Sequence, residues 1–211
     1  MKRDKRLKIK EVILTHISNN KKEYFIITLL FIIWIFLGVF FTNNINETEQ
    51  ESIKEYINTF IETLKNSQNI NSIELLKNSI FSYVLLALII WFFGTTVIGI
   101  PIVFGIIIYK GFCLGYTISI FIKILGMQQG MTFIFSSIFL QNILIIPATI
   151  AIAVSGFKLY KAIVKDRKKE TIKMEILRHT IFSLIMIIIL CLAGVIEVFA
   201  SNNLLKWILG Q

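Results

Sequence analysis

Long stretches without charges alternate with short charged segments along the chain. The first stretch, residues 24–42, contains 19 residues and no charge. A helix rises about 1.5 Å per residue, so this stretch would span roughly 29 Å, the thickness of a bilayer's hydrocarbon core. Residues 43–46 provide no small-residue cleavage site. The pattern therefore predicts an uncleaved membrane span rather than a signal peptide.

The next apolar stretch is too long for a single crossing. Residues 80–125 would form a helix of about 69 Å, which is enough for two spans. We predict the break between these spans at Gly99 and Pro101. Glycine suits the position just past a helix end, and proline suits the first turn of the next helix.

Two further spans follow. A short link at 126–130 precedes an apolar stretch at 131–157, and residues 179–200 form the last such stretch. The predicted fold class is therefore all-α, a polytopic membrane protein with five transmembrane helices.

The distribution of charge predicts how these spans are oriented. Residues 1–23 and 158–178 each carry eight Lys or Arg, whereas residues 43–79 carry three Lys and six Glu. The positive-inside rule places the two basic segments, and with them the N-terminus, in the cytoplasm and the 43–79 loop outside. The stretch 80–157 must then cross an odd number of times, and its length fits three crossings. The C-terminal segment 201–211 is expected outside.

Composition supports the membrane class and limits the chemistry. The chain has 211 residues, of which 55% are hydrophobic and 17% charged, and its formal charge is +9. A soluble domain carries about a quarter charged residues. The positive charge lies in two blocks, which indicates membrane orientation rather than nucleic-acid binding. Each extramembrane segment is too short to build its own core, so no extramembrane catalytic domain is expected.

The predicted spans also lack a recognisable catalytic motif. Asp4 and Asp166 are the only aspartates and lie outside the spans, which excludes an intramembrane aspartyl dyad. His16 and His179 belong to no HExxH zinc motif, and we expect no pairing of a serine with a histidine within the bilayer. The two cysteines lie in spans and are interpreted as packing residues. The sequence predicts no catalytic residue, metal or cofactor, and a protein that is not an enzyme.

Several polar residues within the spans need an explanation. Lys110 lies about ten residues into the third span, where a lysine costs about 2.5 to 3.5 kcal/mol. It either snorkels to the cytoplasmic interface, or binds a free backbone carbonyl, or makes a polar contact with Asn142 that would mark an ion or proton path. Gln141 is the neighbouring intramembrane amide. Glu197 and Lys123 are expected near the outer interface, either as a pair or as two solvated charges.

Small residues recur at four-residue spacing in the third span, at Gly111, Gly115 and Ser119. Such a face lets two helix backbones approach closely in lipid. We predict that it packs against a neighbouring helix, and a helix of the same chain is favoured over a partner's.

The outer loop contains the pattern of an amphipathic helix. Ser52 and Glu55 fit a capping box at its start. The loop's charge of −3 disfavours binding to anionic lipid, so the apolar face should cover either the protein's own bundle or a partner. Its apolar residues follow helical spacing and are the candidate partner-binding residues: Ile53, Tyr56, Ile57, Phe60, Ile61 and Leu64.

The order and spacing of several short motifs resemble the stage II sporulation protein M family over nearly the whole chain. The five spans, the outer loop after the first span and Glu197 late in the last span also match this family. The motifs that carry the resemblance are Gly99-Ile100-Pro101, Lys110-Gly111 with Gly115 and Thr117, Gln141-Asn142, and Ile146-Pro147-Ala148.

The resemblance implies a non-enzymatic membrane scaffold in endospore-forming bacteria. It would anchor and localise stage II sporulation proteins D and P (SpoIID and SpoIIP), which degrade peptidoglycan, for septal thinning and engulfment. Its expected place is the mother-cell membrane at the septum and the engulfing membrane. The alternative is a small permease or channel subunit, motivated by Lys110, Asn142 and the proline-broken helices.

Overall fold

The computed structural model describes residues 9–66, 72–165 and 169–209, and every regular element in these ranges is a helix. At some of these positions only the backbone is described, namely at residues 9, 60, 61, 63–66, 72, 136, 137, 169 and 199–209. The helices are α1 (Ile9–Asn19), α2 (Lys21–Asn43), α3 (Glu47–Asn66), α4 (Ser72–Gly94), α5 (Ile100–Phe133), a π-helical segment (Ile134–Phe139), α6 (Leu140–Lys165) and α7 (Lys169–Leu209).

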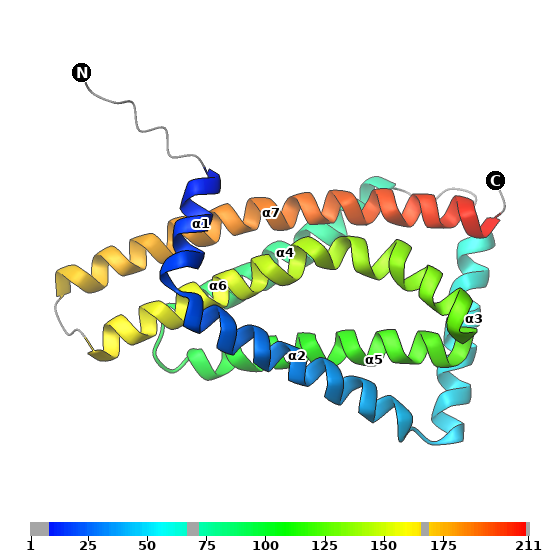
Figure 1. Cartoon of the computed structure of the whole chain (residues 1–211). Helices are drawn as coiled ribbons and strands as arrows, with labels where there is room; N and C mark the ends of the chain where they lie inside the picture. The colour runs from blue at the N-terminus through cyan, green and yellow to red at the C-terminus, as the bar shows by residue number, and fades with distance from the viewer. Residues whose placement is uncertain (1–8, 67–71, 166–168, 210–211) are drawn as a thin grey trace.

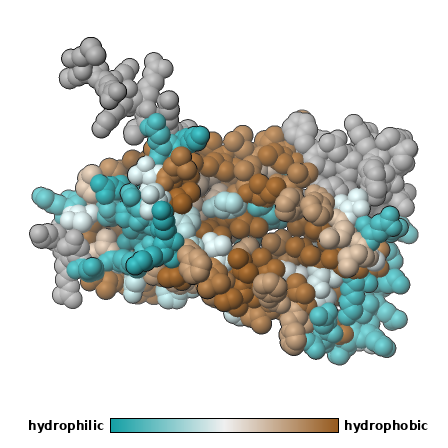
Figure 2. Space-filling view, viewed as in Figure 1, coloured by the Kyte–Doolittle hydropathy of each residue, from teal (hydrophilic) through white to brown (hydrophobic). Residues whose placement is uncertain are grey.

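Five of these helices are long and apolar enough to cross a membrane, which confirms the predicted number of spans. They are α2, α4, α5, α6 and α7. Figure 1 shows that they run along one common direction, while α1 lies across the bundle near one end and α3 across the opposite end. We call these the α1 end and the α3 end. In the space-filling view a broad apolar belt separates hydrophilic surfaces at the two ends (Figure 2).

Two turns bound the third span, the first made by glycine and proline and the second by glycine alone. α4 ends at Gly94, and α5 begins at Ile100 with Pro101 in its first turn. The Thr96 hydroxyl accepts a hydrogen bond of 3.0 Å from the backbone N–H of Gly99 and so holds the connecting turn. At the other end, Gly126 breaks α5 with φ 80° and ψ 167°. Glycine tolerates this positive φ because it has no Cβ.

α6 is the central helix of the bundle. All of its residues from 148 to 156 are buried, because neighbouring helices cover α6 on several sides. Small side chains in this stretch allow close contact. A Cβ placed on Gly156 would lie 2.9 Å from the Cα of Gly94 on α4, nearer than real Cβ atoms come to other atoms. The α4–α6 crossing therefore depends on glycine at both positions.

The small face of the third span lies against α2 of the same chain. A Cβ on Gly111 would approach the carbonyl oxygen of Phe31 to 2.7 Å, and a Cβ on Gly115 would overlap the backbone of Ile35. Ser119, one turn further along, is half-buried. The glycines thus let the backbones of α2 and α5 come into contact, as in other close helix pairs in membranes.

Much of both basic segments is helical. The basic N-terminal segment contains α1, and residues 158–165 and 169–178 extend α6 and α7 beyond the predicted spans. The predicted capping box in the outer loop is wrong. α3 begins at Glu47, so Ser52 lies inside the helix, where its hydroxyl donates to the carbonyl oxygen of Thr48 at 3.0 Å.

Candidate functional site

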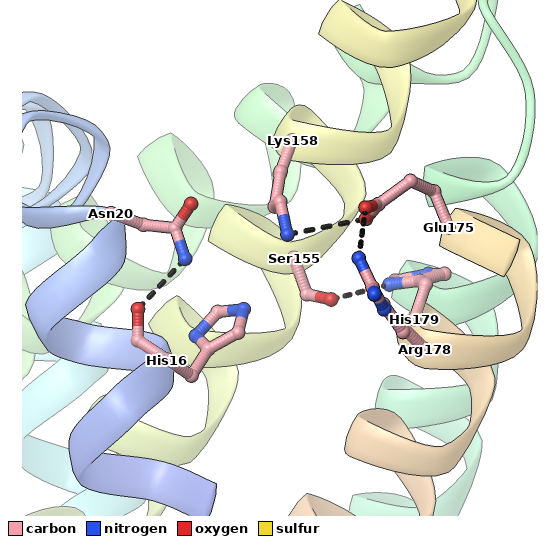
Figure 3. A network of polar contacts seen from close by, with 7 residues as sticks. All are labelled: His16, Asn20, Ser155, Lys158, Glu175, Arg178 and His179. Atoms are coloured by element: carbon pink, nitrogen blue, oxygen red, sulfur yellow. Dashed lines mark hydrogen bonds and ion pairs between the residues drawn. The ribbon is translucent and has the colours of Figure 1, made fainter. Parts of the chain in front are cut away.

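A polar cavity of about 550 Å³ lies at the α1 end, between α1, α6 and α7. Polar side chains from all three helices meet there (Figure 3). Apolar side chains form the rest of its wall. The lining residues are Glu11, Val12, Thr15, His16, Asn19, Asn20, Ser155, Lys158, Glu175, Arg178, His179, Ile181 and Phe182.

One carboxylate on this wall binds two cations. Glu175 Oε2 lies 3.2 Å from Lys158 Nζ, and Glu175 Oε1 accepts a hydrogen bond of 2.7 Å from Arg178 Nη1. The Glu175 side chain is only 13% exposed, whereas those of Lys158 and Arg178 are 37% and 63% exposed. The two cations are thus held in place by a common partner while much of each remains open. The Lys158–Glu175 pair joins α6 to α7 where the two helices leave the apolar belt, and the Arg178–Glu175 pair lies within α7.

His179 has both ring nitrogens occupied. Nε2 lies 3.3 Å from the carbonyl oxygen of Trp91, which only accepts, so Nε2 carries the ring proton. Nδ1 is therefore an acceptor, and the Ser155 hydroxyl donates a hydrogen bond of 3.0 Å to it. Figure 3 shows the two side chains joined between α6 and α7. This network fixes the imidazole at the junction of α4, α6 and α7.

The expectation that no serine pairs with a histidine within the bilayer is therefore wrong, since Ser155 and His179, which lie in two predicted spans, form such a pair. They come from different spans, and no local motif announces them. Ser155 is buried inside the central helix α6, where the neighbouring backbone N–H groups already bond within the helix. Those amides are thus not available as oxyanion-hole donors. The pair is best understood as a positioning contact.

His16 joins α1 to the bundle. Its Nδ1 lies 3.0 Å from the Tyr24 hydroxyl, and its ring stacks on Phe182 of α7 with centroids 3.9 Å apart. Nε2 is buried and has no partner in the part of the chain that the structure describes. Burial, followed by the nearby charges of Lys158 and His179, lowers the pKa of His16 from 6.5 to about 4, while Glu175 acts in the opposite direction. His16 is therefore neutral at pH 7.

Asn20 sets the angle at which α1 crosses the bundle. Its backbone has φ −127° and ψ 34°, so the helix is interrupted between α1 and α2. The side chain is 5% exposed and its Nδ2 donates to the carbonyl oxygen of His16 at 2.7 Å. An asparagine suits this position because its short side chain bonds to the nearby backbone. The bend carries His16 over α6 and α7.

The intramembrane pair named from the sequence lies away from this cavity. Lys110 and Asn142 both line a small cavity of about 30 Å³ whose other walls are mostly apolar. Asn142 Nδ2 donates to the carbonyl oxygen of Ile138 at 2.7 Å, and no hydrogen bond joins it to Lys110 among the described contacts. Gln141 is half-buried beside Asn142. Lys110 and Asn142 are close to each other, but the cavity that they share has room for only about one or two water molecules.

Glu197 and Lys123 do not form the pair that the sequence left open. Glu197 Oε2 accepts a hydrogen bond of 2.8 Å from the hydroxyl of Tyr83, which joins α7 to α4. Lys123 Nζ donates to the backbone carbonyl oxygen of Thr42 at 3.2 Å, which joins α5 to the end of α2. Each charge is therefore bound to a neutral group on a different helix.

Helix α3 turns only part of its apolar face toward the bundle. Ile57 is 4% exposed and Ile53 is half-buried, whereas Tyr56 is 74% exposed. The side chains of Phe60, Ile61 and Leu64 lie outside the described residues. The described part of α3 thus contacts the bundle along one side and presents an aromatic ring on another.

The cavity at the α1 end was not predicted because its parts are far apart in the sequence. His16, Ser155 and His179 lie on three different helices, and no local motif links them. One signal was available. The predicted topology placed both histidines of the chain at the cytoplasmic boundaries of spans, at similar depth.

These features define a polytopic α-helical membrane protein with five spans, interfacial helices at both ends and a polar cavity at one of them. The profile of the Stage II sporulation protein M family matches residues 27–202, from the first span to the end of the last, and the chain belongs to this family. No curated protein and no solved structure shows significant similarity to the chain.

Proposed function

We propose that the protein is a non-enzymatic membrane scaffold that localises peptidoglycan-degrading enzymes during endospore formation. Its partners in this proposal are stage II sporulation proteins D and P. Membership of the Stage II sporulation protein M family supports a role in sporulation. The short extramembrane helices support a role in binding rather than in catalysis, because none of them is long enough to build a core of its own.

One observation carries the proposal: α3 exposes an aromatic side chain at the end of the bundle. Ile57 anchors the helix inward, while Tyr56 at the preceding position is 74% exposed. Aromatic side chains are enriched at protein interfaces, because they bury a large area at low entropic cost. The proposed orientation has the α3 end outside, where the cell wall and its hydrolases lie. α3 would then be the contact surface for those enzymes.

Affinity purification tests this proposal directly. The tagged protein is recovered from membranes of sporulating cells after mild cross-linking, and co-purifying proteins are identified by mass spectrometry. We expect both wall hydrolases with the wild type and a loss of at least fivefold with Tyr56→Ala. Recovery of the intact protein without either hydrolase would refute the scaffold function.

A matched variant distinguishes the loss of a binding contact at Tyr56 from a general loss of folding. Asn58 is also exposed on α3, and Asn58→Ala should retain both hydrolases. Both variants should reach the membrane in wild-type amounts.

A fluorescent fusion of the protein tests the localisation, since it is expected at the septum and then in the engulfing membrane of the mother cell.

The structure offers less support for a permease or channel. Such a protein needs a continuous polar path with its substrate site near the middle of the membrane. The cavity shared by Lys110 and Asn142 has a volume of about 30 Å³ and is lined otherwise by apolar side chains and Thr149. A lysine at this depth has room for hydration by about one or two water molecules rather than for a transported solute.

A further inference from the structure

We propose that the cavity between α1, α6 and α7 binds the headgroup of a zwitterionic phospholipid, with the phosphate at Lys158 and Arg178 and the ammonium group at Glu11. The ligand is thus a phosphoethanolamine headgroup whose acyl chains stay in the bilayer. The inference rests on the cavity alone and does not depend on the proposed scaffold function.

The size and lining of the cavity fit a ligand of this kind. Its volume of about 550 Å³ lies within the range of about 300 to 1,000 Å³ typical of ligand pockets. Hydroxyl and amide groups of Thr15 and Asn19 add hydrogen-bonding capacity on the α1 side. The apolar part of the wall, formed by Val12, Ile181 and Phe182, suits the glycerol and upper acyl region of a lipid.

The walls of the cavity carry charges of both signs on different helices, as a zwitterion requires. Lys158 and Arg178 share the single carboxylate of Glu175, so that wall retains one formal positive charge. Arg178 gives one N–H to Glu175 and is 63% exposed, which leaves donors free for a phosphate oxygen. Glu11 on α1 is exposed and supplies a carboxylate on the other side of the cavity.

The position of the cavity along the bundle matches the depth of lipid headgroups. Lys158 and Arg178 lie directly outside the apolar stretches 131–157 and 179–200, and Asn20 lies about one helical turn before the stretch 24–42. Three spans therefore leave the hydrocarbon region at the level of the cavity, and α1 crosses the bundle there (Figure 1). Ile181, one turn further into the apolar belt, is 50% exposed and faces the lipid. Basic pockets between helices at this level bind the phosphates of anionic lipid headgroups in other membrane proteins, and Glu11 is the group that would favour a headgroup that also carries an ammonium.

Native mass spectrometry of the purified full-length protein tests the inference. The protein is released from detergent micelles in the presence of dioleoyl phosphatidylethanolamine or dioleoyl phosphatidylglycerol, and the bound lipid is counted at each concentration. We expect one phosphatidylethanolamine per chain at saturation. Lys158→Gln combined with Arg178→Gln should weaken its binding about thirtyfold, from about 1 kcal/mol for each basic residue at a lipid surface.

Matched variants distinguish the cavity from general charge. Lys165→Gln combined with Lys173→Gln removes the same charge from α6 and α7 at exposed positions outside the cavity and should leave binding unchanged. Arg178→Lys, which keeps the charge, should retain most of the affinity, and its melting temperature shows that the fold persists. Glu11→Gln should lower affinity for phosphatidylethanolamine while leaving phosphatidylglycerol unaffected.

Three results would overturn the inference. An equal loss of lipid with the control pair would show that overall charge, and not the cavity, holds the lipid. Binding of phosphatidylglycerol as tight as that of phosphatidylethanolamine would remove the role of Glu11. Displacement of the lipid by millimolar inorganic phosphate would identify a free anion as the ligand.

Discussion

The ring of His16 on α1 stacks on the ring of Phe182 on α7, with the centroids 3.9 Å apart and the planes inclined by 20°. The contact joins the first helix of the described chain to the last. It also removes His16 from water, and this burial is the main reason why its pKa falls to about 4. The stability of the contact between α1 and the bundle therefore depends on pH.

Acidification should weaken this attachment. In the unfolded chain His16 takes up a proton below about pH 6.5, whereas in the folded protein it remains neutral down to about pH 4. The unfolded state binds more protons between these values, so the stability that is present above pH 6.5 is lost as pH falls toward 4. After allowance for the partial exposure of His16, we expect a loss of about 1 kcal/mol between pH 7 and pH 5.

His16→Phe isolates this contribution, because phenylalanine preserves the stacking on Phe182 and does not titrate. The free energy of unfolding in mixed micelles is compared at pH 7 and pH 5 for both proteins. The wild type should lose about 1 kcal/mol more than the variant. Equal losses in the two proteins would mean that His16 does not carry the pH dependence.

Removal of the Ser155 hydroxyl should destabilise the junction of α4, α6 and α7. Ser155→Ala leaves His179 Nδ1 as a buried acceptor without a donor, at a cost of about 1 to 3 kcal/mol. Ser183 is the matched control, since its hydroxyl is buried without a partner among the described residues. Ser183→Ala should change the unfolding free energy by less than about 0.5 kcal/mol. A similar cost for both variants would show that the Ser155 contact contributes nothing specific.

The sequence predicts the spans well and the polar contacts poorly, for different physical reasons. A span must bury its backbone polar groups within one continuous apolar helix, so residues 24–42 reveal it without any tertiary information. Gly99 and Pro101 mark a turn for equally local reasons. α1 and the ends of α6 and α7 are helices outside the apolar belt, where hydropathy carries no signal.

The contacts of single polar residues depend on where whole helices pack. Counted from the ends of their spans, Glu197 and Lys123 have a similar depth, and the sequence therefore leaves open that they pair. Depth does not determine which helices are neighbours. In the structure α7 packs on α4, which places the Tyr83 hydroxyl within 2.8 Å of the Glu197 carboxylate.

Glycine packing between α2 and α5 should be intolerant of even one methyl group. A Cβ on Gly115 would overlap the carbonyl group of Ile35, so Gly115→Ala forces the two helices apart. We expect a loss of about 1 to 3 kcal/mol in unfolding free energy, the usual cost of overpacking. Gly105→Ala is the control on the same helix, because a Cβ there has no atom within 4 Å. If Gly115→Ala were as stable as the control, the close approach of α2 and α5 would be in error.

A double-mutant cycle tests the partner of Glu197. Tyr83→Phe, Glu197→Gln and the combined variant should give a coupling energy of about 1 to 2 kcal/mol, because a neutral donor binds a partly buried carboxylate. The matched cycle of Lys123→Gln with Glu197→Gln should give less than about 0.5 kcal/mol, since Lys123 binds the Thr42 carbonyl instead. Unfolding free energies in mixed micelles supply both values. A larger coupling of Glu197 to Lys123 than to Tyr83 would restore the ion pair at the α3 end and would require α7 to rotate away from α4.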